Sequence, residues 1–89
     1  MKYHITPNQA KEIKEEQFYS LFNEIVKRED WYKYHHKKMD IGKMIDYLDE
    51  VTIGKSVIDN IWNVFVFEEN YIGEELVDAL WNAVKDEFK

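Results

Sequence analysis

The 89-residue sequence predicts an α+β fold with two amino-terminal helices, a short β-hairpin and a carboxy-terminal amphipathic helix. Two observations support this prediction. Three stretches repeat apolar residues at the spacing of one helix face, and a β-branched and aromatic run, residues 62–67, lies between the second and the third. A chain of this length can bury one core, so we expect residues 1–89 to form a single domain.

The first helix is predicted from a start signal in residues 6–9. Thr6 can act as the N-cap, Pro7 suits the first helical position, and Gln9 can complete a capping box. We expect this helix to end near residues 28–30. Its buried face is predicted to consist of Ala10, Ile13, Phe18, Leu21, Phe22 and Ile25.

Residues 31–38 interleave aromatic, basic and histidine side chains without a regular period. We expect a connector or an irregular helix here, with Trp31 and Tyr34 against the core and with His35, His36 and the lysines in solvent. The alternative is a nucleic-acid-binding surface, because bases stack on aromatic rings that lie beside cations. We favour the first interpretation, since the net charge of −6 repels phosphate.

Two more helices are predicted from caps and apolar stripes. Asp40 is a good N-cap for a helix that continues to about Glu50, with an apolar face of Ile41, Met44, Ile45 and Leu48. In the last helix, Glu74 and Glu75 occupy the first turn, where the helix dipole favours negative charge. The buried stripe of that helix is predicted to be Val77, Leu80, Trp81, Val84 and Phe88.

Residues 51–67 fit either a helix or a hairpin. The run from Trp62 to Phe67 is typical of a strand, and Asp59-Asn60 can form the tight turn that joins it to residues 56–58. Ile53, Val57 and Ile61 fit a helical face, and residues 53–63 echo residues 72–82, which favours an all-α four-helix domain instead. We favour the hairpin on composition.

The segments DIGKMIDYL (40–48) and ELVDALWNAVK (75–85) resemble motifs in small uncharacterised proteins of phages and prophages in low-GC Gram-positive bacteria. Those proteins often read TIGKMIEFL near the start and LCDALWEAVK near the end. The resemblance spans residues 40–88 and implies a Trp-containing strand between the two helices. Val77 stands where the motif has Cys, and the first predicted helix has no counterpart. The resemblance implies no activity.

The two halves of the chain differ in charge. Residues 1–39 hold eight basic and six acidic residues, whereas residues 40–89 hold four basic and twelve acidic residues. The acidic half predicts an electropositive partner. The candidate partner-binding residues surround a predicted turn at residues 70–73, with Tyr71 as the central apolar anchor: Glu68, Glu69, Tyr71, Glu74, Glu75 and Asp78. Their alternative interpretation is a solvated loop followed by a helix start.

Several kinds of chemistry lack the residues that they need. The chain has no Cys, so it cannot form a disulfide, a thiolate nucleophile or a Cys-based zinc site. Neither Ser20 nor Ser56 lies in a Gly-x-Ser-x-Gly motif, and the three glycines are too far apart for a phosphate-binding loop. The histidines lack a metal-binding spacing. We therefore expect no catalytic residues, no cofactor and no metal.

The sequence also bears on location. It has no apolar run near the roughly 20 residues of a membrane helix and no signal-peptide pattern. We expect a soluble protein of the cytoplasm, which is the host cytoplasm if a phage encodes it, without a membrane partner.

The leading hypothesis is a non-catalytic, acidic, phage-type accessory protein. It would bind and inhibit a host nucleic-acid-handling protein with a basic surface, as an anti-CRISPR inhibitor does, without contacting nucleic acid itself. Two alternatives remain open. One is a small structural or oligomerisation subunit that buries exposed aromatic side chains against copies of itself. The other is a nucleic-acid-binding module that uses residues 31–38.

Overall fold

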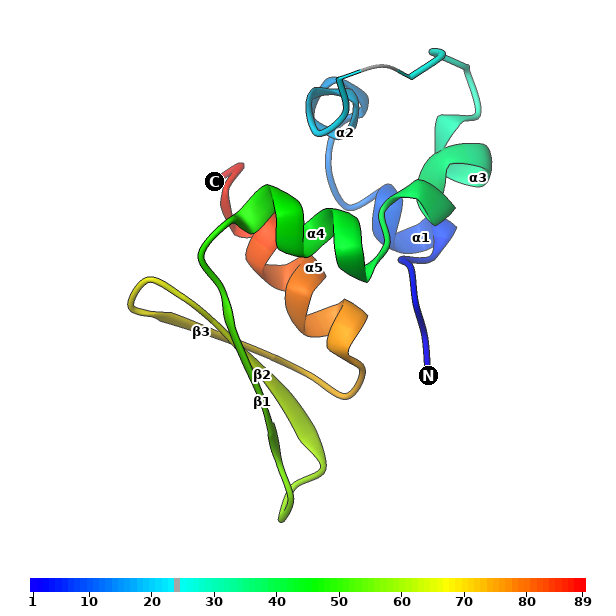
Figure 1. Ribbon diagram of the computed structural model, residues 1–89. Helices are drawn as coiled ribbons and strands as arrows, with labels where there is room; N and C mark the ends of the chain where they lie inside the picture. The colour runs from blue at the N-terminus through cyan, green and yellow to red at the C-terminus, as the bar shows by residue number, and fades with distance from the viewer. Residues whose placement is uncertain (24) are drawn as a thin grey trace.

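The computed structural model describes residues 1–23 and 25–89 and confirms the α+β class (Figure 1). Residues 52–56 and 61–66 are strands, which excludes the four-helix alternative. The elements, in order, are α1 (Pro7–Ala10), α2 (Glu15–Ser20), α3 (Trp31–His35), the 3-10 helix η1 (His36–Lys38), α4 (Ile41–Leu48), β1 (Thr52–Ser56), β2 (Ile61–Val66), β3 (Glu69–Gly73) and α5 (Leu76–Asp86).

The predicted start of the first helix is confirmed. The Gln9 amide donates to Thr6 Oγ1 at 3.1 Å, and the Thr6 amide donates to Gln9 Oε1 at 2.9 Å, which completes the capping box. The predicted length is wrong, because α1 ends at Ala10 and a separate helix, α2, follows. Ile13 and Phe18 are five residues apart, so one continuous helix would turn them about 140° away from each other. The break between α1 and α2 lets both side chains enter the core.

An aromatic cluster holds the segment after α2. Phe18 is fully buried, and its ring centroid lies 4.7 Å from that of Trp31 at the start of α3. The Tyr19 hydroxyl accepts a hydrogen bond from the Arg28 amide at 2.8 Å. These contacts hold the segment after α2 against the core. The sequence had predicted that the first helix would continue there, to residues 28–30. Phe22 and Ile25 of the predicted stripe are only partly buried.

Residues 31–38 form the irregular helix that was expected, α3 followed by η1, but its side chains are arranged differently. Trp31 is buried as predicted, whereas Tyr34 is 52% exposed. Both histidines are buried, which corrects the expectation that they lie in solvent. His36 Nδ1 lies 2.9 Å from the Tyr32 carbonyl oxygen, and His35 Nε2 lies 2.8 Å from that of Val26. Each carbonyl oxygen satisfies one nitrogen of a buried ring, whereas His35 Nδ1 is buried without a partner among the described residues.

The helices α4 and α5 pack against each other, and α5 supplies more buried residues to the core than any other element. The predicted cap of α4 is confirmed, since the Lys43 amide donates to Asp40 Oδ1 at 2.8 Å. In α5, the stripe of Val77, Leu80, Trp81 and Val84 is fully buried, and Phe88 is partly buried. Glu75 is the N-cap residue and Glu74 precedes it, so neither lies in the first turn as predicted.

The sheet is an antiparallel meander in the order β1-β2-β3, and α5 packs on β2 and β3 (Figure 1). Gly54 pairs with Asn63, and Val64 pairs with Tyr71. The hairpin prediction is therefore confirmed for β1 and β2. Its bounds are wrong, because Val57 and Ile58, predicted to be strand, belong to the four-residue connection 57–60. The sequence predicted a turn at residues 70–73, which is wrong, because these residues belong to the third strand.

Candidate partner-binding surface

The six predicted partner-binding residues do not form one patch. Glu68 lies in the turn between β2 and β3 and Glu69 is the first residue of β3, whereas Glu74, Glu75 and Asp78 lie beyond the other end of β3. A strand rises about 3.4 Å per residue, so the two groups are separated by roughly 14 Å along β3. The extended strand divides the acidic residues between two ends of the sheet.

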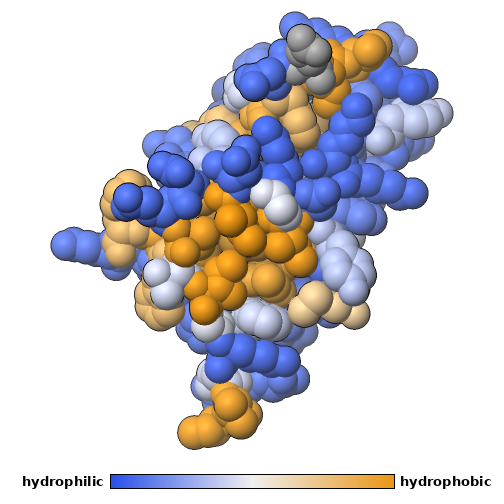
Figure 2. All heavy atoms as spheres, in the orientation of Figure 1, coloured by the Kyte–Doolittle hydropathy of each residue, from blue (hydrophilic) through white to orange (hydrophobic). Residues whose placement is uncertain are grey.

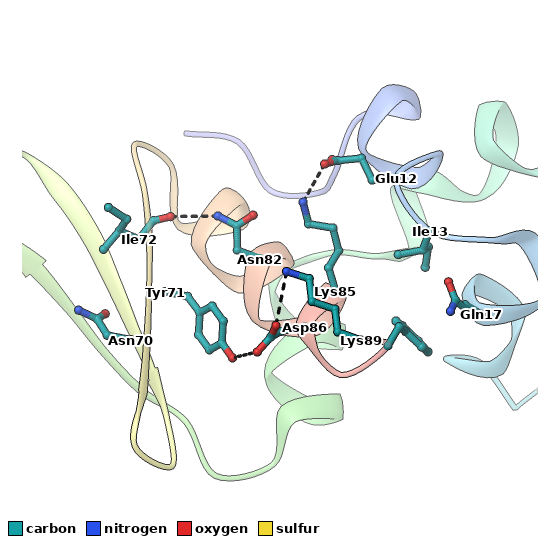
Figure 3. Close-up of a pocket in the computed structure, with 11 residues that line it drawn as sticks. Glu12, Ile13, Gln17, Asn70, Tyr71, Ile72, Asn82, Lys85, Asp86 and Lys89 are labelled. Atoms are coloured by element: carbon teal, nitrogen blue, oxygen red, sulfur yellow. Dashed lines mark hydrogen bonds and ion pairs between the residues drawn. The ribbon is translucent and has the colours of Figure 1, made fainter.

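Tyr71, the predicted central anchor, ties the sheet to α5. Its ring is partly buried against the core, and its hydroxyl donates a hydrogen bond to Asp86 Oδ2 at 2.5 Å (Figure 3). This hydrogen bond raises the pKa of Tyr71 to about 12, with smaller contributions from burial and from the charges of Asp86, Glu69 and Glu87. The side chain is thus held inside the fold at neutral pH.

A cleft of about 530 Å³ lies beside Tyr71, between β3, α5 and the segment from Glu12 to Gln17 (Figure 3). Lys85 Nζ lies 2.7 Å from Glu12 Oε2, and Lys89 Nζ lies 3.6 Å from Asp86 Oδ1. The charged side chains that line this cleft are therefore paired with one another. The lining residues are Glu12, Ile13, Gln17, Asn70, Tyr71, Ile72, Asn82, Lys85, Asp86, Phe88 and Lys89.

The turn between β2 and β3 presents an aromatic side chain among carboxylates. Phe67 is 83% exposed, and it is followed directly by the exposed Glu68 and Glu69. Its φ of 57° lies in the left-handed region, which costs an L-residue about 1–2 kcal/mol. In a two-residue hairpin loop with positive φ only at its first residue, that residue is usually Gly. The fold thus holds Phe67 in solvent at some cost in stability. We call this group the β2–β3 turn surface.

The opposite end of the sheet also presents exposed apolar side chains beside carboxylates. Val57 and Ile58, at the turn between β1 and β2, are 94% and 95% exposed. Beside them, Asp59, Glu74 and Glu75 line a hollow of about 380 Å³ together with Asn60 and Ile61. We call this group the β1–β2 turn surface. It again combines exposed apolar side chains with carboxylates.

The carboxylate of Asp78 is paired with side chains of the amino-terminal segment. Lys2 Nζ lies 2.6 Å from Asp78 Oδ1, and Gln9 Nε2 donates to the same oxygen at 2.7 Å. The Lys2 amide also donates to Glu75 Oε2 at 3.3 Å. Within the described residues, Glu68, Glu69 and Glu74 make no such contact.

Sequence reasoning missed the apolar members of both turn surfaces, Phe67, Val57 and Ile58, and the carboxylate Asp59. One signal was present. A turn predicted at Asp59-Asn60 requires the two apolar residues before it to lie near the hairpin tip, where no core can cover them.

The aromatic rings of residues 31–38 are already engaged within the fold. Trp31 is buried, the Arg28 guanidinium lies 3.7 Å from the Tyr34 ring centroid, and Lys11 Nζ lies 4.3 Å from that of Tyr32. These contacts favour the packing interpretation of this segment over base stacking.

No model of a protein family matches the chain, and neither a curated protein nor a solved structure matches it. Across residues 1–23 and 25–89, no group of three or more His, Asp or Glu side chains could hold a metal ion. Over the same residues, none of the helices has the length and apolar character to cross a membrane.

Proposed function

We propose that the protein is a non-catalytic inhibitor that binds the basic groove of a host nucleic-acid-handling protein, such as a CRISPR effector, and competes with nucleic acid for it. The supporting observation is that both ends of the sheet present exposed apolar side chains beside carboxylates, Phe67 with Glu68 at one end and Ile58 with Asp59 at the other. The resemblance of residues 40–48 and 75–85 to phage proteins supports the choice of a host target.

The two kinds of side chain have different tasks in this proposal. Carboxylates attract a basic surface over about one Debye length, about 10 Å at 0.1 M salt, and speed the encounter. Apolar side chains such as Phe67 act only at contact, where their burial slows dissociation. An acidic surface that carries such anchors suits a groove that normally holds a phosphate backbone.

The test begins with capture of partners from a host lysate on the immobilised chain, at low and at high salt. The captured protein is then purified, and its nucleic-acid binding is measured with and without the chain. We expect the chain to inhibit this binding and added nucleic acid to release the chain. A variant with Glu68, Glu69, Glu74 and Glu75 changed to Gln is the control, and it should inhibit weakly. Inhibition equal to that of the parent would contradict the proposal, and so would a partner that handles no nucleic acid.

A second candidate function is a self-associating structural subunit. It is favoured by the sheet face that points away from α5, where no residue of the three strands is charged and Phe65 and Ile72 are exposed. Light scattering would show an oligomer that persists at high salt and that Phe65→Asp dissociates. The residues of this face are Thr52, Gly54, Ser56, Ile61, Asn63, Phe65, Asn70 and Ile72.

A further inference from the structure

The sheet has a free edge at β1. Its strand order is β1-β2-β3, α5 packs on β2 and β3, and α4 packs on α5, whereas β1 is in contact chiefly with β2. In Figure 1, α4 lies in front of α5 just as β1 lies in front of β2. The helix α4 and the free edge of β1 are therefore on the same side of the molecule.

A layer of two packed helices is wider than a sheet of three strands. Two packed helices, each about 10 Å in diameter, span about 20 Å. Three strands with a spacing of about 4.8 Å span about 14 Å. Because α5 contacts β2 and β3 and α4 contacts α5, these dimensions leave about the width of one strand on the β1 side of the sheet.

Apolar side chains line this open position. Ile41 and Ile45 of α4, Val51 before β1 and Ile53 of β1 are all only partly buried against the core. Ile53 pairs with the buried Val64 and so lies on the face of the sheet that α5 covers. Figure 2 shows a continuous hydrophobic area in this region, where Figure 1 has α4, α5 and β1. A fourth strand would cover it.

We propose that an extended segment of a partner protein adds to the free edge of β1, with alternate apolar side chains against Ile45 and Ile53 and with Lys or Arg at both of its ends. Strand addition supplies backbone hydrogen bonds, and the pockets for alternate side chains supply selectivity. Basic ends complement the exposed carboxylates at the two ends of β1, Asp49 and Glu50 before the strand and Asp59 after it. This inference does not depend on whether the partner handles nucleic acid.

A second copy of the chain fits this position less well than a single segment does. Antiparallel pairing of two β1 strands about Gly54, the middle residue, places Asp49 of one copy opposite Asp59 of the other, where like charges repel. The two-fold axis would also bring both α4 helices over the same pair of strands. One extended segment meets neither obstacle.

The experiment selects binders from a displayed library of short random peptides, with the full chain as the target. We expect the enriched peptides to alternate apolar residues between basic ends. A peptide from this set should slow amide hydrogen exchange in β1, residues 52–56, and leave that of β3, residues 69–73, unchanged. Ile45→Asp should weaken its binding about tenfold or more. Ile72→Asp is the matched control, because Ile72 is exposed on the other face of the sheet, and it should bind as the parent does.

Three results would overturn the proposal. The first is a selection that enriches no alternating sequence, and the second is a peptide that protects β3 instead of β1. The third is a dimer that protects β1 without any peptide, which would make a second copy the occupant. Circular dichroism establishes that each variant is folded. If Ile45→Asp does not fold, Ile41→Asp at the start of α4 repeats the test with the same expected loss of affinity.

Discussion

The hydroxyl of Tyr71 on β3 donates a 2.5 Å hydrogen bond to Oδ2 of Asp86 in the last turn of α5. Because the acceptor is a carboxylate and the ring is partly buried, Tyr71→Phe should lower the free energy of unfolding by about 1–2 kcal/mol at neutral pH. Urea denaturation measures this difference. Tyr34→Phe is the control, since the Tyr34 ring is half exposed, and it should change the free energy of unfolding by less than about 0.5 kcal/mol.

The same hydrogen bond predicts how stability depends on alkaline pH. The pKa of Tyr71 rises from its ordinary value of 10.0 to about 12 on folding. Below pH 10.0 the phenol is protonated in both states, and its contribution is complete. As the pH rises from there to about 12, the unfolded chain loses the proton first, so the free energy of unfolding falls. Urea denaturation across this interval should show a steeper fall for the parent than for Tyr71→Phe. Equal slopes for the two proteins would mean that the hydrogen bond does not raise the pKa of Tyr71 in the folded state.

His36 predicts a loss of stability on the acidic side. Burial lowers its pKa from the ordinary value of 6.5, against the opposing effect of the Tyr32 carbonyl. Above pH 6.5 the ring is neutral in both states. Below it, the unfolded chain takes up a proton more readily than the folded chain, so the free energy of unfolding falls. His36→Gln should flatten this dependence in urea melts between about pH 7.5 and about pH 5. An unchanged slope would mean that other groups cause the pH dependence of the free energy of unfolding.

The buried stripe of α5 predicts which substitutions unfold the chain. Leu80 and Trp81 are fully buried, so Leu80→Ala or Trp81→Ala should each lower the free energy of unfolding by about 2–5 kcal/mol. Val57→Ala at the exposed hairpin tip should change it by less than about 0.5 kcal/mol. Thermal denaturation compares the three variants. A melting temperature of Leu80→Ala near that of Val57→Ala would show that α5 presents another face to the core.

The two turn surfaces predict separate effects on partner binding. Changing Glu68, Glu69, Glu74 and Glu75 to Gln should lower the association rate about tenfold at low salt and flatten its salt dependence. Phe67→Ala should act mainly on the dissociation rate, because an aromatic anchor contributes contact and not attraction at a distance. Surface-based kinetics against the captured partner measures both rates.

The matched control for these charges is a variant with Glu15 and Glu16 changed to Gln, both exposed in α2. It removes carboxylates from the other half of the chain and should leave the association rate unchanged. If it slows binding as much as a double variant of Glu68 and Glu69 does, the attraction comes from net charge and not from the turn surface.

Features that depend on neighbouring residues could be predicted from the sequence. The caps at Thr6 and Asp40 are of this kind, because a side chain and an amide three residues away decide each of them. The stripe of α5 is predictable because its apolar residues are three and four positions apart. The break after α1 could not be predicted, since it depends on the packing of Phe18 against Trp31, thirteen residues later. The strand β3 was missed because Asn70 and Gly73 are typical of turns, and pairing with β2 overrides that preference.

The candidate site could be predicted only in part, because residues that are close in sequence are not always close in space. Glu68 to Asp78 are close in sequence, which indicates one acidic cluster, but an extended strand separates its ends. The contact of Lys2 with Asp78 joins residues 76 positions apart, and no local pattern reveals it. The exposure of Phe67 follows from the position of a turn that the sequence did not predict.

The contacts of the amino-terminal segment with α5 have a consequence for the order of folding. Lys2, Gln9 and Glu12 reach α5 across 76, 69 and 73 residues, whereas turns of four and two residues join the strands of the sheet. Closing a long loop costs more entropy than closing a short one, and contacts between distant residues form later. We expect the sheet and α5 to assemble first and residues 2–12 to close over α5 last. Transient opening of the native state should begin with the same residues.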